Sequence, residues 1–220
     1  MKFDSVAPMK SADVINAISK ARLVPVVVLE SATQAVPLAR ALVAGGLPVA
    51  EVTFRTPAAA DAIRAIAQAV PEILLGAGTV LTPDQAEAAK DAGAKFLVTP
   101  GFNPDVVRKA QSLDLPIVPG VNNPSHVEQA MSMGLEVLKF FPAEASGGVA
   151  MLKALKGPYP GIRFVPTGGV GAGNVADYLR LPNVVACGGS WMVDPVRIAA
   201  GDFDAIIRLT REAMDVVRAV

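Results

Sequence analysis

A lysine lies in the middle of a short apolar run, where a charged side chain needs an explanation. Residues 137–148 read VLKFFPAEASGG, so Lys139 is part of a segment with the apolar character and the Gly/Ser-rich end of a buried strand. Because removing an ammonium group from water is costly, a buried lysine is usually paired. Burial and a nearby positive charge both favour the neutral amine, which is a nucleophile for carbonyl carbons. We therefore treat Lys139 as a candidate nucleophile.

A second set of polar residues lies upstream, in the segment AEVTFR. Alternate residues of a strand share a face, so Glu51, Thr53 and Arg55 lie on one face and Val52 and Phe54 on the other. The first face carries an acid, a hydroxyl and a base, whereas the second is apolar and suits packing against helices. If the polar face looks inward, its charges can approach the candidate lysine. The alternative is a structural ion pair that only neutralises that lysine.

Several other kinds of chemistry are disfavoured by what the chain lacks. It has 220 residues with one histidine, His126, and one cysteine, Cys187. A metal site of the common kind needs several such ligands, so we expect no metal. His126 follows a predicted helix start, where we expect an exposed first-turn side chain rather than a catalytic base. A single cysteine allows no internal disulfide, which fits a reducing compartment.

Charge and hydropathy narrow the class of protein further. The 20 Lys and Arg residues balance 20 Asp and Glu, and no basic block indicates a nucleic-acid partner. The apolar runs are short and interrupted, so we expect no membrane span. The first residues, MKFDSVAPMK, contain Asp4 and precede a polar helix pattern, which is not typical of a secretory signal. These features predict a cytoplasmic protein.

The elements that must position these residues alternate regularly along the chain. Eight short apolar runs are strand candidates: 23–30, 48–55, 73–80, 95–100, 116–121, 136–141, 163–168 and 184–189. Amphipathic helix patterns separate them, and several begin with Thr-Pro or Asn-Pro, a cap followed by proline. The repeat of about 20–26 residues is the size of a βα unit. We predict a single domain over residues 1–220, an α/β fold of the (β/α)8 TIM-barrel type, with an extra N-terminal helix at 11–21 and a closing helix from about 202. An open doubly wound sheet is the alternative.

Small and polar residues follow several of the predicted strands. Barrel enzymes build their sites at these carboxyl ends, and glycines after the last two strands let backbone N–H groups reach a phosphate. The residues at these ends are Thr79, Thr99, Pro100, Thr167, Gly168, Gly169, Gly188, Gly189 and Ser190. The later GVGAG run is not a dinucleotide fingerprint, because no βαβ unit with a ribose-binding acid follows it.

Taken together and in order, six motifs resemble those of a known enzyme family. They are EVTFRT (51–56), GAGTV (76–80), VTPGFNP (98–104), LKFFPAE (138–144), PTGG (166–169) and GGSWM (188–192). The chain resembles the 2-keto-3-deoxy-6-phosphogluconate (KDPG) aldolases, class I enzymes of the Entner–Doudoroff pathway, over nearly its whole length. This resemblance implies a TIM barrel, a homotrimer, and a reaction that uses neither metal nor cofactor.

The resemblance also implies a role for each matching position. Lys139 is expected to form a Schiff base with the C2 ketone of the substrate, and Glu51 to act as general acid and base. Arg55 and Thr79 are expected to hold the carboxylate. The remaining positions divide into pocket walls and a region for the far, phosphorylated end of the substrate: Pro100 and Phe141 for the former, and Thr167, Gly168, Gly169, Gly189 and Ser190 for the latter.

The expected reaction therefore cleaves a small keto-acid phosphate into pyruvate and glyceraldehyde 3-phosphate. A side activity on 4-hydroxy-2-oxoglutarate is compatible with the same residues, as is a preference for the galactonate-configured substrate. Two alternatives from other classes remain at this point. One is a phosphosugar isomerase or epimerase in which Lys139 is only a binding cation, and the other is a catalytically silent sugar-phosphate-binding barrel.

Overall fold

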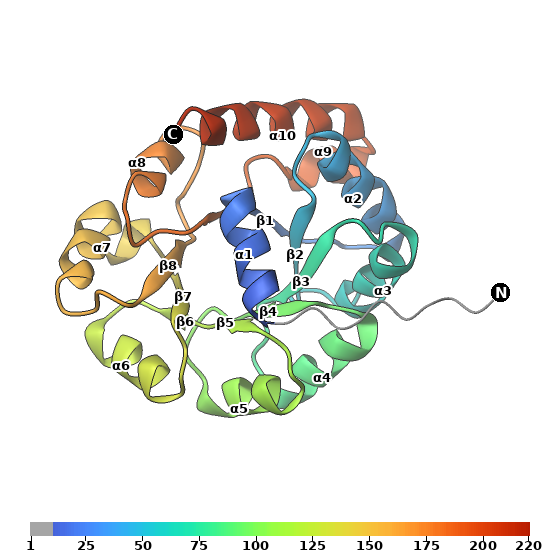
Figure 1. Ribbon diagram of the computed structural model, residues 1–220. Coiled ribbons are helices and arrows are strands. Elements are labelled where there is room, and N and C mark those ends of the chain that lie inside the picture. Colours follow the sequence, from blue (N-terminus) through green and yellow to red (C-terminus); the bar gives the residue numbers. More distant parts are fainter. Residues whose placement is uncertain (1–10) are drawn as a thin grey trace.

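The computed structural model describes residues 11–220, in which parallel strands alternate with helices (Figure 1). Every predicted strand segment contains a strand. The strands are β1 Leu23–Val27, β2 Val49–Thr53, β3 Leu74–Gly78, β4 Phe96–Val98, β5 Ile117–Val118, β6 Gly120–Val121, β7 Val137–Phe140, β8 Arg163–Pro166 and β9 Cys187–Gly189. The fifth predicted segment gives two short strands, because Pro119 between them has no backbone N–H for the ladder.

The helices begin and end largely where capping residues predict. They are α1 Ser11–Ala21, η1 Ala32–Gln34, α2 Ala35–Ala44, α3 Ala59–Ala69, α4 Pro83–Ala92, α5 Pro104–Ser112, α6 Pro124–Ser132, η2 Glu144–Ser146, α7 Gly148–Lys156, α8 Val175–Leu179, α9 Pro195–Ala200 and α10 Phe203–Arg218. Thr82, Asn103 and Asn123 each accept a hydrogen bond from a first-turn N–H and precede a proline at the start of a helix. The short α8 and α9 were not predicted, since five or six residues are too few to show a helical period.

The strands pair only in parallel and curl around a common axis, with helices on the outside (Figure 1). One sheet has the order β5-β4-β3-β2-β1-β9, and a second has the order β6-β7-β8. Two isolated bridges, Phe164 with Val184 and Thr167 with Gly188, join β8 to the segment of β9. The predicted α/β fold with a parallel sheet is therefore confirmed, in the form of a curled sheet.

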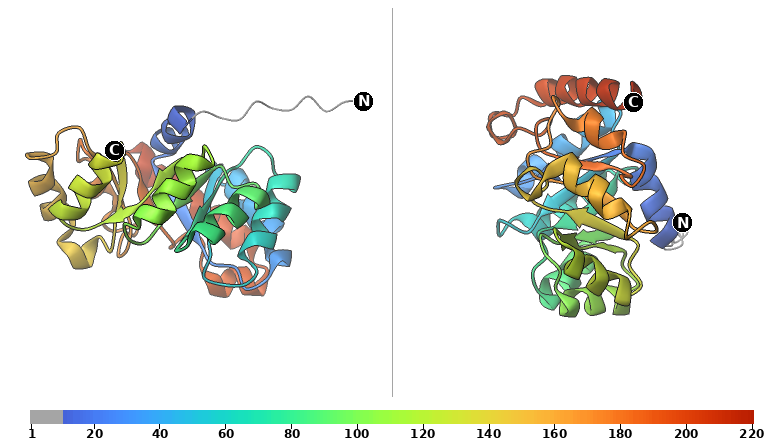
Figure 2. Two further views of the ribbon diagram at one scale, coloured as in Figure 1. Left: turned by 90° about the horizontal axis from the view of Figure 1, so that it is seen from below. Right: turned by 90° about the vertical axis from the view of Figure 1, so that its left-hand side faces the viewer.

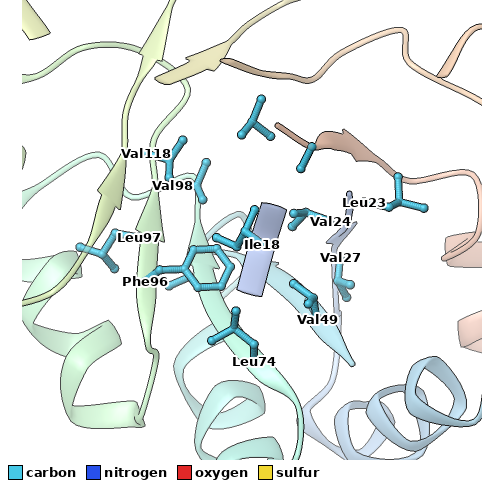
Figure 3. Packing of buried hydrophobic residues seen from close by; sticks show 14 of the residues in the cluster. Ile18, Leu23, Val24, Val27, Val49, Leu74, Phe96, Leu97, Val98 and Val118 are labelled. Carbon is cyan, nitrogen blue, oxygen red and sulfur yellow. The ribbon is translucent and has the colours of Figure 1, made fainter. Parts of the chain in front are cut away.

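The helix α1 covers one end of the curled sheet (Figure 2). Because a single residue, Arg22, separates α1 from β1, the helix lies where the strands begin. Its Ile18 is 2% exposed and points among strand side chains such as Val24, Phe96 and Val118 (Figure 3). Apolar packing thus seals the amino ends of the strands and leaves their carboxyl ends to the loops that carry the polar motifs.

The sequence analysis predicts no membrane span, no metal site and no secretory signal. Among the helices of residues 11–220, none combines the length and the hydropathy that a membrane span requires. Over the same range, no three His, Cys, Asp or Glu side chains gather as metal ligands would. The expectation that the N-terminus carries no secretory signal concerns residues 1–10, which lie outside the described residues.

Candidate active site

The buried lysine and the buried glutamate of the sequence analysis lie together inside the curled sheet. Lys139 is on β7 and Glu51 on β2, and the Lys139 Nζ to Glu51 Oε1 distance is 3.6 Å, with each side chain 3% exposed. Both side chains line an internal cavity of about 20 Å³ with Thr167 and with the apolar residues Ile18, Val24, Phe96, Val98, Val118 and Val165. The strand alternation that placed Glu51 on an inward face therefore describes its position correctly.

The pairing leaves hydrogen-bonding capacity unused. Glu51 Oε1 is buried and has no hydrogen-bond partner among residues 11–220. Burying two charges costs more than an imperfect ion pair returns, so such a pair is weak evidence for a purely stabilising role. An unpartnered carboxylate oxygen beside an amine can instead exchange protons with a ligand that enters the site. The arrangement suits a proton-transfer pair better than a purely structural ion pair.

An aromatic ring covers the amine from one side. The Lys139 Nζ lies 5.0 Å from the centroid of the Phe141 ring, which follows β7 by one residue. This distance is within the range of a cation–π interaction, and the ring also excludes water from the amine. Pro100, predicted as a second wall, is half-buried at the end of β4 and lies against Gly120, which neighbours Lys139 in the sheet.

Arg55 and Thr79 meet at the ends of two neighbouring strands. The Arg55 Nε donates a hydrogen bond of 3.3 Å to Thr79 Oγ1. Thr79 follows β3 and has a φ of +53°, a conformation that β-branched residues rarely adopt. Strained residues of this kind persist where the surroundings hold them, often at functional sites. Together the guanidinium and the hydroxyl form a donor pair that suits a carboxylate.

The three polar residues of AEVTFR do not share one environment, which corrects the sequence interpretation. Thr53 is buried, and its hydroxyl donates to the Val27 carbonyl at 2.9 Å, so it ties β2 to β1. The strand ends at Thr53, and the chain then turns, which leaves Arg55 exposed. Within residues 11–220, Arg55 forms no ion pair or hydrogen bond with Glu51, and its Nε contacts Thr79 instead. The approach of its guanidinium to Lys139 stays a prediction.

The glycine-rich ends of β8 and β9 lie against each other. Thr167 is buried and bridges Gly188, and a Cβ on Gly188 would lie 2.3 Å from the Thr167 Oγ1. Gly168 and Gly169 have φ values of +96° and +79°, which favour glycine. This close approach of two loops places backbone groups where an anion can reach them.

The end of β9 is covered by the single tryptophan of the chain. A Cβ on Gly189 would lie 1.9 Å from the Trp191 ring, so the ring packs directly on that backbone. Ser190, between them, is exposed. Its hydroxyl is therefore accessible to a ligand at this end of the site.

Two residues next to this loop were not found from the sequence. Glu144 packs against Gly169, and the Tyr178 hydroxyl donates a hydrogen bond to the Glu144 carboxylate. Glu144 is part of the LKFFPAE motif, which offered a signal of position. Its partner lies 34 residues away on the unpredicted α8, so the pairing could not be read from spacing.

Comparisons with known proteins agree with one another. A family model described as KDPG and KHG aldolase matches residues 14–209. A 2-dehydro-3-deoxy-phosphogluconate aldolase of Haemophilus influenzae is 51% identical over 205 residues, covering 93% of this chain and 97% of that protein. A KHG/KDPG aldolase of Escherichia coli is 48% identical, covering 88% and 91%. A crystal structure of KDPG aldolase from Legionella pneumophila, with pyruvate captured as a covalent carbinolamine intermediate, is 40% identical with a TM-score of 0.88, covering 93% and 98%.

Proposed function

The chain belongs to the KDPG and KHG aldolase family, and we propose that it cleaves 2-keto-3-deoxy-6-phosphogluconate into pyruvate and glyceraldehyde 3-phosphate through a Schiff base on Lys139. It is thus a carbon–carbon lyase. The observation that carries the assignment of residues is the buried contact of 3.6 Å between the Lys139 amine and the Glu51 carboxylate. The covalent pyruvate carbinolamine in the Legionella relative supports the same chemistry.

Schiff-base formation needs a neutral amine and a nearby group that carries protons. The Lys139 Nζ attacks the C2 ketone, and the resulting carbinolamine loses water to give a protonated imine. Glu51 protonates the departing hydroxyl and later activates the water that hydrolyses the product imine. Since its Oε1 has no hydrogen-bond partner within residues 11–220, this oxygen is free to exchange those protons.

Cleavage then uses the imine as an electron acceptor. A base removes the proton of the C4 hydroxyl, the C3–C4 bond breaks, and its electron pair moves onto C3 and the imine nitrogen to form an enamine. The C4 fragment leaves as an aldehyde. Protonation of the enamine at C3 and hydrolysis of the imine release pyruvate and restore the Lys139 amine. Glu51 is the base we assign to the C4 hydroxyl.

The remaining residues hold the two ends of the substrate. Arg55 and Thr79 receive the carboxylate next to the reacting ketone, since the guanidinium offers two parallel donors. Pro100 and Phe141 form the walls beside the imine. The far end, with its phosphate, is assigned to the loops after β8 and β9 that contain Thr167, Gly168, Gly169, Gly189 and Ser190.

We further infer that β5 and β6 act as one strand, so that eight strands close a (β/α)8 barrel in a single domain over residues 1–220. The bridge between Thr167 and Gly188 supports this closure.

The family resemblance supports a cytoplasmic homotrimer that needs neither metal nor cofactor. The name of the Escherichia coli relative covers two substrates, so 4-hydroxy-2-oxoglutarate is a second substrate to be tested. The names of the relatives favour neither the galactonate-configured substrate nor an isomerase.

The deciding experiment is to treat the protein with pyruvate and sodium borohydride and to locate any adduct by peptide mass spectrometry. We expect a reduced pyruvate adduct on the peptide that contains Lys139. The variant Lys139→Met keeps the length of the side chain and should give no adduct, whereas Lys109→Met, on an exposed ion pair with Glu87, should react like the wild type. If the folded wild-type protein gave no adduct, the Schiff-base aldolase proposal would be wrong, and the isomerase and binding-protein alternatives would have to be considered again.

A further inference from the structure

The side chain of Glu144 lies directly behind the loop that we assign to the phosphate. A Cβ on Gly169 would lie 2.5 Å from the Glu144 Cγ and 2.8 Å from its Cβ, so the stem of Glu144 occupies that side of the glycine. The backbone N–H of Glu144 also donates to the Gly168 carbonyl at 3.1 Å. The backbone of residue 144 thus holds one carbonyl of the loop, and the Glu144 side chain fills the space behind Gly169.

Fixing this carbonyl has a consequence for the next N–H group. The Gly168 C=O and the Gly169 N–H belong to one planar, trans peptide, so they point in opposite directions. When the carbonyl is held toward Glu144, the N–H faces away from Glu144. On the other side, the Asn174 side chain donates to the Gly169 carbonyl at 3.0 Å and accepts from the Gly171 N–H at 2.8 Å. The loop is thus held between Glu144 and Asn174.

The charge of Glu144 would oppose a phosphate if the carboxylate could swing freely. Tyr178 prevents this, because its buried hydroxyl donates to the Glu144 Oε1. Burial and the neighbouring carboxylate both raise the pKa of Tyr178, so its hydroxyl stays protonated and remains a donor over the whole physiological range. The carboxylate is consequently held on the α8 side of the loop.

We propose that Glu144, held by Tyr178, is a positioning residue that orients the Gly168–Gly169 peptide toward the phosphate of the substrate. This inference rests on the proposed function, in which this loop receives the phosphate. It assigns no contact with the reacting carbon atoms. Loss of the contacts of Glu144 with Tyr178 and Gly169 should weaken recognition of the phosphorylated end of the substrate. The chemistry at the pyruvate end should remain intact.

The test is the variant Tyr178→Phe, measured with two reactions. Cleavage of KDPG uses both ends of the site, whereas exchange of the pyruvate methyl protons with D2O uses only the pyruvate end. We expect the KM for KDPG to rise about fivefold or more, with kcat and the exchange rate within about twofold of the wild type. The other tyrosine, Tyr159, donates to Glu128 at 2.8 Å in the same way, and Tyr159→Phe should change neither reaction.

A second pair of variants separates positioning from a general loss of structure. Glu144→Ala removes the stem behind Gly169 and should raise the KM as Tyr178→Phe does, while Glu144→Gln keeps the stem and the acceptor oxygen and should restore a KM near that of the wild type. An unchanged KM in both Tyr178→Phe and Glu144→Ala would overturn the inference, as would a parallel fall of the exchange rate. Failure of the wild type to form the borohydride adduct would defeat the proposed function instead.

Discussion

Glu51 lies over Gly78 so closely that a Cβ on Gly78 would stand 1.9 Å from the Glu51 Oε1. The two residues are on neighbouring parallel strands, since β2 pairs with β3 and Thr53 is in register with Gly78. The space for the carboxylate is therefore provided by the missing side chain of Gly78. A glycine in the GAGTV motif thus determines whether Glu51 can reach Lys139.

The variant Gly78→Ala should displace the Glu51 carboxylate while leaving the curled sheet intact. We expect kcat to fall by roughly tenfold or more, and the free energy of unfolding to fall by about 1–3 kcal/mol, as for an overpacked core. Pyruvate release and urea unfolding measure the two effects. Gly161→Ala is the matched control, because nothing lies within 4 Å of its Cβ position. Wild-type kcat in Gly78→Ala would show that catalysis does not need this position of Glu51.

Removing the charge of Glu51 tests its role in proton transfer directly. Glu51→Gln has nearly the same shape, so we expect KDPG cleavage and pyruvate proton exchange both to fall by about 100- to 10,000-fold. The control is Glu136→Gln, which makes the same change in a carboxylate that is 77% exposed and 3.9 Å from Arg163. Loss of less than about tenfold in Glu51→Gln would assign the proton transfers to another group.

Much of the fold was predictable because its signals are local. Apolar runs of strand length and Thr-Pro or Asn-Pro caps located each strand segment and most helices. The short α8 and α9 were not predicted, because five or six residues are too few to show a helical period. The split of the fifth strand segment was not predicted either, and it follows from the missing backbone N–H of Pro119.

The site was predictable where strand alternation decides which way a residue points. Glu51 and Lys139 lie within regular strands, so their inward orientation followed from a period of two. Arg55 lies past the end of its strand, where alternation no longer applies, and its Nε donates to Thr79 Oγ1. The contact of Glu144 with Tyr178 joins distant segments and has no local signal.

The strained backbone of Thr79 predicts that relieving the strain stabilises the protein and weakens its binding of pyruvate. Glycine at this position stabilises the folded protein by removing strain of about 1–3 kcal/mol at φ +53°. It also destabilises the folded protein by roughly 0.5–1 kcal/mol, because the unfolded chain gains conformational entropy. We expect Thr79→Gly to unfold with equal or higher free energy, yet to bind pyruvate more weakly because Arg55 loses its hydroxyl partner. Urea unfolding and the pyruvate dependence of borohydride trapping measure these effects.

The control for Thr79 is Asp114, which has a φ of +50° in the loop before β5, at the opposite end of the strands. Asp114→Gly should relieve less strain, because aspartate tolerates this conformation better than a β-branched residue, and it should leave pyruvate binding unchanged. A Thr79→Gly variant that is less stable than the wild type and fully active would contradict the assignment of strain to function.

The buried thiol of Cys187 predicts how stability changes with pH. Burial raises the pKa of Cys187 from 9.0 to about 12, with a small opposing effect of Arg22. The folded protein keeps this proton between those two values, whereas the unfolded chain loses it above about pH 9. The contribution of the thiol to stability is therefore fully present below pH 9 and is lost as the pH rises toward 12, by at most about 1.4 kcal/mol per pH unit.

Urea unfolding of the wild type and of Cys187→Ala tests this prediction at about pH 8 and about pH 10. The wild type should lose more unfolding free energy between the two pH values than the variant does, by about 1 kcal/mol. Titratable groups that do not interact with Cys187 affect both proteins equally and cancel in the difference. Tyr178 does not cancel, because Cys187 contributes to the raised pKa of Tyr178, and its effect adds to that of the thiol in the wild type. Equal pH dependence in the two proteins would mean that the thiol ionises in the folded state as readily as in the unfolded chain, which its complete burial in β9 opposes.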